Sequence, residues 1–515
     1  MEKYLSVAEM RSVEREANEK GLSYATMMEN AGTNLAFWIN QEYNLCNPRS
    51  ALALVGSGNN GGDALVALCR LIELGWHASA CVVNRQYEND PLIQRFLRMG
   101  GSLFDWEGFA TGAILSNLFQ HTSVLIDGIL GTGARLPLTQ DIARLLDYSR
   151  QLVLDRKGKI HVIALDCPSG INCDTGEAAL EAIPAEVTFT MAGIKMGMLK
   201  FPAANLIGTI RVGSIGNLTD VIAWKDIKRG VITGDDVFPK LPTRALDAHK
   251  GTFGTALIIA GSGNYPGAML LAGEAAYRIG AGLVTIAIPD LIYPAVAGVL
   301  REATWLRLPH TDGWIDKESY VCVSDILPRV NALLVGPGVG LNQSTGGFLE
   351  KLIHHPLPPS IFDADGLKLL ARIPEWQSII SETAILTPHP GEMSVLTGLA
   401  KEEIQSNRVE IAEVYAKKWT KVVVLKGAYT VIADPHGTTA IVPIATPALA
   451  RAGTGDVLAG LIVGLLAQGM DKFQAAYMGA YIHAMAGLAA EIHLGHSASV
   501  LASDVVRMIP GVISK

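Results

Sequence analysis

Short apolar runs alternate with helical patterns along the whole chain, and this alternation limits the fold more than any other feature. In the first half the apolar runs cover residues 51–55, 77–83, 123–126, 161–165 and 187–191. In the second half they cover residues 255–260, 283–288, 332–335, 360–362, 384–386 and 421–425. Such alternation predicts an α/β fold with parallel sheets covered by helices. Ligands of these sheets bind beyond the carboxyl ends of the strands, so the residues that follow each run are the first functional candidates.

The chain is long enough for two domains. Its 515 residues are 49% hydrophobic and 18% charged, which excludes a disordered chain. The pattern loosens in the polar stretch 217–230, and this predicts domains at 1–226 and 227–515. The two halves contain similar sequence segments, at 51–59 and 256–264, but the residues that follow these segments differ. We interpret the two segments as independent occurrences of one strand-turn-helix motif. The alternative is a duplication that produced both halves.

Composition also indicates which partners to expect. The net charge of -7 provides no basic field for nucleic acid or an anionic membrane, so small molecules are the expected partners. The six cysteines form no CxxC pair, which fits a reducing cytoplasm. Residues 1–19 lack the apolar core of a secretory signal, and the apolar run 457–470 is shorter than the roughly 20 residues of a membrane span. We expect a cytoplasmic homo-oligomer with no transmembrane segment.

A glycine-rich turn with one carboxylate lies near the end of the chain. The segment Ala452-Gly453-Thr454-Gly455-Asp456 runs into the apolar stretch 457–466, which predicts a helix that begins at this turn. The first amide groups of a helix have no intrahelical acceptors and lie at the positive end of its dipole, so they can bind phosphate. A carboxylate beside an anion is unfavourable unless it has a chemical role, such as taking a proton from a hydroxyl that attacks phosphorus. Asp456 is therefore the candidate catalytic base.

Further segments of the second half accompany this turn at 249–254, 336–340, 363–367, 387–392 and 426–430. Together and in this order they resemble the ribokinase-like fold, and more narrowly the ADP-dependent NAD(P)H-hydrate dehydratase family, over about 229–510. The resemblance implies a three-layer α/β domain in which ADP, or ATP in some relatives, phosphorylates the C6 hydroxyl of a hydrated nicotinamide ring. Loss of phosphate then regenerates NADH or NADPH. Magnesium would accompany the nucleotide.

The same resemblance implies roles for individual residues. The hydrate would contact Ala268, Gly338, His389 and Asp456, although a histidine between two prolines can also be a plain loop residue. The nucleotide would contact Lys426, Gly427, Ala428, Tyr429, Thr430 and Gly455.

A second glycine-rich segment, 58–63, lies between the apolar run 51–55 and a helix expected over 65–74. It is not the GxGxxG fingerprint of a nicotinamide dehydrogenase, and no acidic residue in a matching second strand supports one, so hydride transfer is not expected. With segments 127–133 and 166–170 it resembles the NAD(P)H-hydrate epimerase domain over about 1–220. The resemblance implies a Rossmann-like three-layer sandwich that interconverts the R and S hydrates at C6.

In that family the hydrate lies between two glycine-rich loops, with Asp166 as the acid/base at the reacting carbon. Lys195 matches a family lysine, with a solvated loop lysine as the alternative. A potassium ion would take oxygen ligands from Asn60, Asp127 and Ser169, because hard oxygen donors suit such an ion. The implied hydrate-binding residues are Asn59, Asn60, Gly61, Gly62, Asp63, Gly131, Thr132, Gly133, Ala134, Arg135 and Asp166.

The leading hypothesis is a bifunctional repair enzyme acting on the NADH and NADPH hydrates, NADHX and NADPHX. One domain epimerises them, and the other dehydrates the S form with ADP to give NAD(P)H, AMP and phosphate. The rival is a ribokinase-like vitamin or sugar kinase fused to a non-catalytic nucleotide-binding domain. The acids Asp127 and Asp166 favour catalysis in the first domain, because carboxylates do not help a protein to bind an anionic dinucleotide.

Overall fold

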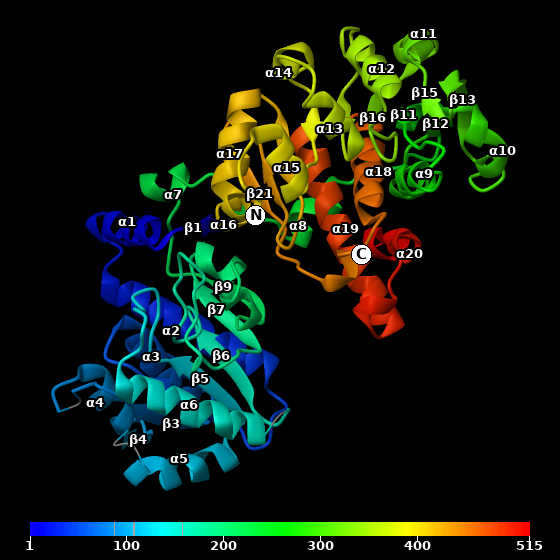
Figure 1. Cartoon of the computed structure of the whole chain (residues 1–515). Helices are drawn as coiled ribbons and strands as arrows, with labels where there is room; N and C mark the ends of the chain where they lie inside the picture. The colour runs from blue at the N-terminus through cyan, green and yellow to red at the C-terminus, as the bar shows by residue number, and fades with distance from the viewer. Residues whose placement is uncertain (87, 107–108, 157, 515) are drawn as a thin grey trace. The chain divides into compact units, whose positions relative to one another are not determined.

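The computed structural model describes residues 1–86, 88–106, 109–156 and 158–514 (Figure 1). Its contacts divide the chain into two compact units, Glu2–Lys228 and Arg229–Lys515, and the second unit also includes Met1. We call them the front unit and the rear unit. The division coincides with the beginning of strand β10 (Arg229–Val231), close to the predicted boundary at 226.

The front unit is built around a parallel sheet in the order β4-β3-β2-β5-β6-β7-β9. From the central pair the chain proceeds to β3 and β4 on one side and to β6, β7 and β9 on the other. The carboxyl ends of β2 and β5 therefore flank the switch point at which such sheets bind ligands. The short strand β1 (Glu2–Leu5) lies outside this seven-stranded sheet and pairs with β8 (Ile194–Lys195). The sheet strands are β2 (Ser50–Val55), β3 (His77–Val82), β4 (Ser102–Asp105), β5 (Val124–Gly128), β6 (His161–Leu165), β7 (Val187–Met191) and β9 (Thr209–Gly213).

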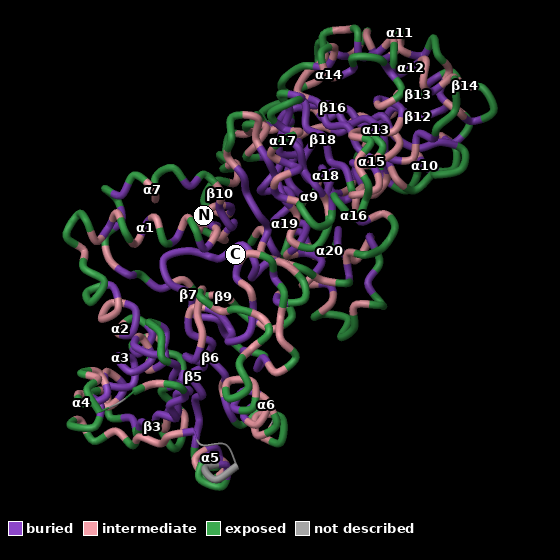
Figure 2. Tube along the Cα trace, turned by 60° about the vertical axis from the view of Figure 1, so that its left-hand side comes forward, coloured by how far each residue is buried: buried purple, intermediate pink, exposed green. Residues whose placement is uncertain are grey.

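Helices cover both faces of this sheet. Because successive side chains of a strand point to opposite faces, Ala53 and Val55 pack in one core with α2 and α3, whereas Leu52 and Leu54 pack in another with α5 and α6. The inner strands β2, β5 and β7 are accordingly buried along most of their length (Figure 2). The helices are α1 (Val7–Glu19), α2 (Tyr24–Glu42), α3 (Asn59–Glu73), α4 (Pro91–Arg98), α5 (Phe109–His121), α6 (Gln140–Asp155) and α7 (Ile222–Asp226).

Helix α3 begins earlier than the sequence predicted. It starts at Asn59, so residues 59–63 form its first turns rather than a loop before it. Glycine permits this early start, since a β-carbon at Gly61 would lie only 2.1 Å from the carbonyl oxygen of Gly56. The helix can therefore begin directly beside the end of β2.

The rear unit contains a second sheet in the order β13-β12-β11-β16-β17-β18-β19-β20-β21-β10. It is parallel from β13 to β19, whereas β20 is antiparallel to both neighbours. Its switch point lies between β11 and β16. A short hairpin joins β14 (His310–Thr311) to β15 (Trp314–Ile315). The other strands are β11 (Thr255–Ile259), β12 (Leu283–Pro289), β13 (Thr304–Leu308), β16 (Ala332–Val335), β17 (Ser360–Phe362), β18 (Ile385–Leu386), β19 (Val422–Leu425), β20 (Val431–Ala433) and β21 (Thr439–Ile441).

Helix α18 is the central helix of the rear core and packs closely on α9. A β-carbon at Gly460 would lie 2.2 Å from the carbonyl oxygen of Ala272, so the two backbones touch. Within the described part of the chain, none of the helices has the length and apolar character that a membrane crossing requires. The rear helices are α8 (Gly234–Val237), α9 (Ala268–Ile279), α10 (Tyr293–Val296), α11 (Tyr320–Ser324), α12 (Gln343–Ile353), α13 (Asp365–Leu370), α14 (Trp376–Ile379), α15 (Pro390–Thr397), α16 (Lys401–Ser406), α17 (Arg408–Trp419), α18 (Thr454–Ala467), α19 (Lys472–Leu494) and α20 (Ala502–Ile513).

Candidate active sites

The glycine-rich turn of the rear unit begins helix α18, as predicted. Its N-cap is Gly453, whose φ of 89° lies in the left-handed region that favours glycine. The Thr454 hydroxyl contacts the carbonyl oxygens of Leu449 and Arg451, both at 2.9 Å, which holds the turn in place. Gly453 has no side chain that could cap the helix. The Thr454 amide donates to the Arg451 carbonyl at 3.4 Å, so the next amide groups of the first turn are the ones available to an anion.

Asp456 lies in the first turn of α18, where it is partly buried. Burial, followed by the negative charge of Asp363, raises the pKa of Asp456 to about 7, although the nearby Lys426 ammonium opposes this shift. A carboxyl group with a pKa near neutrality is a better proton acceptor than one with the ordinary value. The chemistry proposed for Asp456 is therefore compatible with its surroundings.

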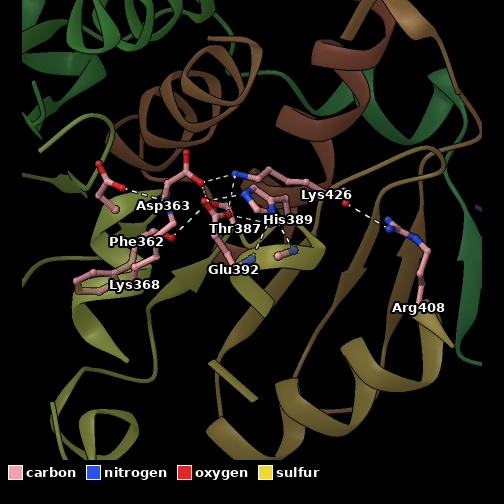
Figure 3. Close-up of polar contacts among 10 residues, drawn as sticks. Phe362, Asp363, Lys368, Thr387, His389, Glu392, Arg408 and Lys426 are labelled. Carbon is pink, nitrogen blue, oxygen red and sulfur yellow. Dashed lines mark hydrogen bonds and ion pairs between the residues drawn. The ribbon is translucent and has the colours of Figure 1, made fainter. Parts of the chain in front are cut away.

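Lys426 connects this turn to a group of buried acids (Figure 3). Its ammonium donates to Asp363 Oδ1 at 2.5 Å and lies 3.6 Å from Glu392 Oε2. The Thr387 hydroxyl donates to the same Asp363 oxygen at 2.8 Å. Burial alone would lower the pKa of Lys426, but the two carboxylates outweigh it and raise the pKa. The Lys426 side chain is therefore protonated and positively charged near neutral pH.

His389 has a structural role at the beginning of α15. Its Nδ1 accepts hydrogen bonds from the amide groups of Gly391 at 2.9 Å and Glu392 at 3.2 Å, while Glu392 accepts from the His389 amide at 2.9 Å. Burial lowers the pKa of the ring, and the Lys426 charge adds to this effect against the opposing Glu392. The imidazole is about half exposed, so it can still contact a ligand.

Five of the six predicted nucleotide-binding residues, 426–430, form the loop between β19 and β20, and the sixth, Gly455, lies in the first turn of α18. After the partly buried Lys426, Gly427 and Ala428 are exposed, and the Thr430 hydroxyl donates to the Gly427 carbonyl at 2.9 Å. Arg408 holds the beginning of this loop, because its guanidinium donates to the carbonyl oxygens of Leu425 and Lys426. Burial lowers the pKa of Arg408 to about 10. Tyr429 has a φ of 54°, and burial raises its pKa.

Two further predicted residues lie at the rear switch point, between β11 and β16. A β-carbon at Gly338 would lie 3.1 Å from Cβ of Ala268, the first residue of α9. Leu271, one turn further along α9, would lie 2.8 Å from a β-carbon at Gly453. The structure therefore brings Ala268 and Gly338 together, and it places the beginning of α9 beside the beginning of α18.

Sequence reasoning assigned no role to Asp363, Glu392 or His483. The two acids were visible only as members of motifs, and their common contact with Lys426 depends on residues far apart in the chain. His483 lies buried on α19, where burial lowers its pKa to about 4 against an opposing hydrogen bond to Thr454. Its Nε2 has no hydrogen-bond partner among the described residues. A single histidine in an apolar helix gives no indication in the sequence that it lies beside Thr454 at the beginning of α18.

The front unit has its own group of polar residues at the ends of β2, β5 and β6. A β-carbon at Gly131 would lie 3.3 Å from both Cγ of Asn60 and Oδ2 of Asp166. Asn60 Nδ2 donates to the Leu130 carbonyl at 3.0 Å. Three segments that are distant in the sequence therefore meet at the front switch point, although Gly133 and Arg135 are exposed to solvent.

The predicted potassium ligands lie in this group. The Ser169 amide and hydroxyl both donate to the buried Asp127 carboxylate, at 2.8 and 2.5 Å, and burial raises the pKa of Asp127 despite these hydrogen bonds. Asn60 Oδ1 is buried and has no hydrogen-bond partner among the described residues. A buried oxygen without a donor fits a hard cation, since an unsatisfied oxygen is costly in the interior.

Lys195 is not a solvated loop lysine, so that alternative is wrong. Its side chain is 1% exposed, and its ammonium donates to the Asp166 carboxylate. The Thr190 hydroxyl at 2.8 Å and the Met191 carbonyl at 2.9 Å complete its contacts. Asp166 itself has a φ of 64°, in a region that most side chains avoid. The Asp166 carboxylate and the buried Lys195 ammonium therefore form an ion pair at a backbone position that few residues adopt.

Glu14 is an acid of the front unit that sequence reasoning missed. Burial raises the pKa of Glu14, and the charge of Asp166 raises it further. The same two causes raise the pKa of Asp63 well above its usual range. Three carboxyl groups therefore influence one another around the Lys195 ammonium. Glu14 comes from the charged helix α1, whose sequence pattern does not distinguish it from its solvated neighbours.

Comparison with known proteins identifies two family regions. The family model described as NAD(P)H-hydrate dehydratase matches residues 256–511, and the YjeF-related protein N-terminus model matches residues 24–197. Among solved structures, an ADP/ATP-dependent NAD(P)H-hydrate dehydratase from Bacillus subtilis, co-crystallised with ATP/Mg²⁺, is 36% identical. The match covers 55% of this chain and 96% of that one, with a TM-score of 0.48.

Fold and sites together define a two-domain α/β enzyme with one switch-point site in each unit. Proteins called bifunctional NAD(P)H-hydrate repair enzyme Nnr match almost the full chain. The Moorella thermoacetica protein is 33% identical, covering 99% of this chain and 96% of its own, and the Thermofilum pendens protein is 35% identical, covering 95% and 92%. The chain therefore belongs to the family of bifunctional NAD(P)H-hydrate repair enzymes. These matches do not favour a vitamin or sugar kinase.

Proposed function

We propose that this chain repairs hydrated NADH and NADPH by epimerisation in the front unit and nucleotide-dependent dehydration in the rear unit. The observation that carries the proposal is the position of Asp456, a carboxyl group with a pKa of about 7 beside the uncapped amide groups of α18 and the Lys426 ammonium. Such a site combines a proton acceptor with donors for a phosphoryl group. A cytoplasmic location and self-association remain predictions.

In the rear unit Asp456 takes the proton of the C6 hydroxyl as that oxygen attacks the terminal phosphorus of ADP. The bond between this phosphorus and AMP breaks, and AMP leaves. The amide groups of the Gly453–Gly455 turn and the charge of Lys426 stabilise the phosphoryl group in transfer. The C6–O bond then breaks, phosphate leaves, and loss of a ring proton restores the reduced nicotinamide. Magnesium bound with the nucleotide would neutralise phosphate charge.

Binding roles in the rear unit follow from the same arrangement. Lys426, Gly427, Ala428, Tyr429 and Thr430 would contact the nucleotide together with Gly455, because this loop begins beside the first turn of α18. The hydrate would lie against Ala268 and Gly338 at the switch point, with the half-exposed His389 at its edge. The proximity of Ala268 and Gly338 and of α9 and α18 supports this assignment.

In the front unit Asp166 would exchange a proton at the reacting end of the hydrate, with Lys195 as its charged partner. The hydrate would lie between the first turns of α3, from Asn59 to Asp63, and the segment from Gly131 to Arg135. Potassium held by Asn60, Asp127 and Ser169 would supply a positive charge near the anionic dinucleotide. Asn60 Oδ1, which is buried and lacks a hydrogen-bond partner within the described part of the chain, supports that ion.

The decisive experiment supplies purified full-length chain with ADP and one hydrate epimer at a time. With the S hydrate, the absorbance of the reduced nicotinamide ring should appear at once. With the R hydrate, it should appear only after the front unit has converted that epimer to the S form. Free phosphate should appear in step with the reduced cofactor. A stable phosphoester on a vitamin or sugar, with no recovery of NADH, would instead establish the kinase alternative. The same assay with ATP determines the nucleotide preference.

The pH dependence of dehydration should follow Asp456. Because its raised pKa is about 7, this group is protonated and inactive as a base below that pH and ionised above it. The rate with the S hydrate should therefore fall by about tenfold per pH unit well below neutrality. Measurement of the steady-state kcat/KM between pH 5 and 9 tests this decrease, which forms the acid limb of the pH profile. A flat profile down to about pH 5 would mean that Asp456 is not the essential base.

Epimerisation should depend on potassium. With tetramethylammonium as the only monovalent cation, conversion of the R hydrate should slow, and added potassium should restore it. In an Asn60→Ala variant, which lacks the unpartnered oxygen, the response to potassium should be lost. The dehydration rate with the S hydrate in the same buffers is the control, because it depends on the rear unit alone and shows whether the change of salt affects that unit. Equal epimerisation in both salts would contradict the assignment.

A further inference from the structure

Three neighbouring parallel strands of the rear sheet each end in a polar residue of one buried network. Asp363 follows β17, Thr387 follows β18 and Lys426 follows β19. Their side chains converge on one Asp363 oxygen, Oδ1, with Lys426 at 2.5 Å and Thr387 at 2.8 Å (Figure 3). Because parallel strands end at the same edge of the sheet, the fold itself brings these groups together.

The network holds more negative than positive charge. The side chains of Asp363 and Glu392 are 1% and 3% exposed, and that of Lys426 is 16% exposed. One ammonium therefore faces two carboxylates. Buried charges are tolerated when they are paired and hydrogen-bonded, so Asp363 and Glu392 together determine where the Lys426 ammonium lies.

This ammonium lies against the first turn of α18. A β-carbon at Gly455 would be 3.6 Å from Lys426 Nζ, and Asp456 is the next residue. Because Gly455 has no side chain, the Lys426 ammonium can lie close to the backbone at the beginning of the helix. A cation held at this place can attract a phosphate group that the helix amides also bind.

We propose that Asp363 is a positioning residue of the dehydratase site, which holds the Lys426 ammonium at the first turn of α18 and, with Glu392, surrounds Asp456 with negative charge. The inference rests on the proposed dehydration of the S hydrate. Asp363 acts through Lys426 and Asp456 and need not contact the substrate. Its role explains why a nucleotide-binding site contains buried acids that would otherwise repel phosphate.

The charged groups around Asp456 set the direction of each effect. Negative charge from Asp363, Asp365 and Glu392 opposes its ionisation, and Lys426 favours it. Asp365 is partly compensated by Lys368, whose ammonium lies 3.1 Å away. The histidines His389 and His483 have lowered pKa values and are neutral near pH 7. Loss of the Asp363 charge should therefore ease ionisation of Asp456, whereas loss of the Lys426 charge should hinder it.

The test compares the pH profiles of three full-length variants with that of the wild type. Asp363→Asn should move the acid limb of kcat/KM for the S hydrate to lower pH by roughly one unit, and Lys426→Met should move it to higher pH by a similar amount. Asp363→Glu, which keeps the charge, should leave the limb close to its wild-type position. Asp325→Asn is the matched control, because Asp325 is exposed on the rear unit.

A second readout does not need turnover. Calorimetric titration with ADP and magnesium should yield weaker binding for Asp363→Asn and for Lys426→Met than for the wild type and Asp325→Asn. Thermal unfolding checks that each variant folds. If Asp363→Asn does not fold, Lys426→Met and Asp363→Glu decide the question by the direction of their shifts.

Two outcomes would overturn the inference. One is an Asp363→Asn protein with the wild-type acid limb and wild-type ADP binding. The other is a shift of the Asp363→Asn and Lys426→Met limbs in the same direction, which a simple loss of structure would produce. If the wild type does not regenerate NADH from the S hydrate, the proposed function fails, and the ADP titrations alone then decide whether Asp363 positions Lys426.

Discussion

Asp456→Asn should lower the rate of S-hydrate dehydration by roughly 10²–10⁴-fold, the usual contribution of a positioned general base. The asparagine has nearly the same shape but cannot accept the hydroxyl proton. The change also removes a partly buried carboxyl group whose pKa is raised by burial, so the fold should lose no stability from it. ADP binding should persist, because the amide groups of α18 and Lys426 remain.

Steady-state assays with the S hydrate measure this loss, and calorimetry with ADP checks that the nucleotide site is intact. Asp325→Asn, an exposed change of the same chemistry, controls for the substitution itself. An Asp456→Asn protein that regenerates NADH at the wild-type rate would require another base. Unchanged epimerisation in the same preparation would confirm that the front unit is unaffected.

Asp166→Asn should strongly slow use of the R hydrate and leave use of the S hydrate intact. The variant lacks the acid/base, and it leaves the Lys195 ammonium buried without its carboxylate. The epimerisation rate should fall by roughly 10²–10⁴-fold. Breaking a buried ion pair by removal of one partner typically destabilises a fold by about 3–5 kcal/mol, so the front unit should also unfold at a lower temperature.

Two measurements separate these effects. Epimerisation is followed well below the unfolding temperature of the variant, and thermal unfolding is recorded in parallel. Lys195→Met combined with Asp166→Asn removes both charges, so it should recover stability without recovering epimerisation. Asp155→Asn, on the exposed end of α6, is the matched control. Conversion of the R hydrate by folded Asp166→Asn at the wild-type rate would exclude Asp166 as the acid/base.

The alternation of apolar runs predicted the buried inner strands of both sheets, because such strands have a strong local signal. It missed the parallel strands β4, β9 and β13, whose side chains are mostly not buried, and the short parallel pair β10 and β21. The predicted run at 161–165, for example, is strand β6. The early start of α3 at Asn59 escaped prediction, since two glycines and two asparagines disfavour a helix interior and their placement depends on contact with Gly56. The antiparallel strand β20 was not predicted, because three apolar residues are too short a run to indicate a strand or its direction.

The sites were predicted only in part. Motifs at strand ends located Asp166, Lys426 and Asp456, because the ends of parallel strands collect ligands in any such fold. The burial of Lys195 and the contact of Lys426 with Glu392 depend on which distant segments meet, and one sequence does not contain that information. Whether each residue acts as proposed is decided by the variants above.

The backbone contact between α9 and α18 at Gly460 has a consequence for selectivity. Ala268 begins one of these helices and Asp456 lies in the first turn of the other, so backbone atoms rather than adjustable side chains set the distance between the two helices. Repacking of core rotamers cannot widen that distance. The spacing of Ala268 and Asp456, the two residues on these helices proposed to contact the hydrate, should therefore be rigid. We expect the enzyme to reject alcohols bulkier than the hydrated nicotinamide ring even when their phosphate donor binds tightly.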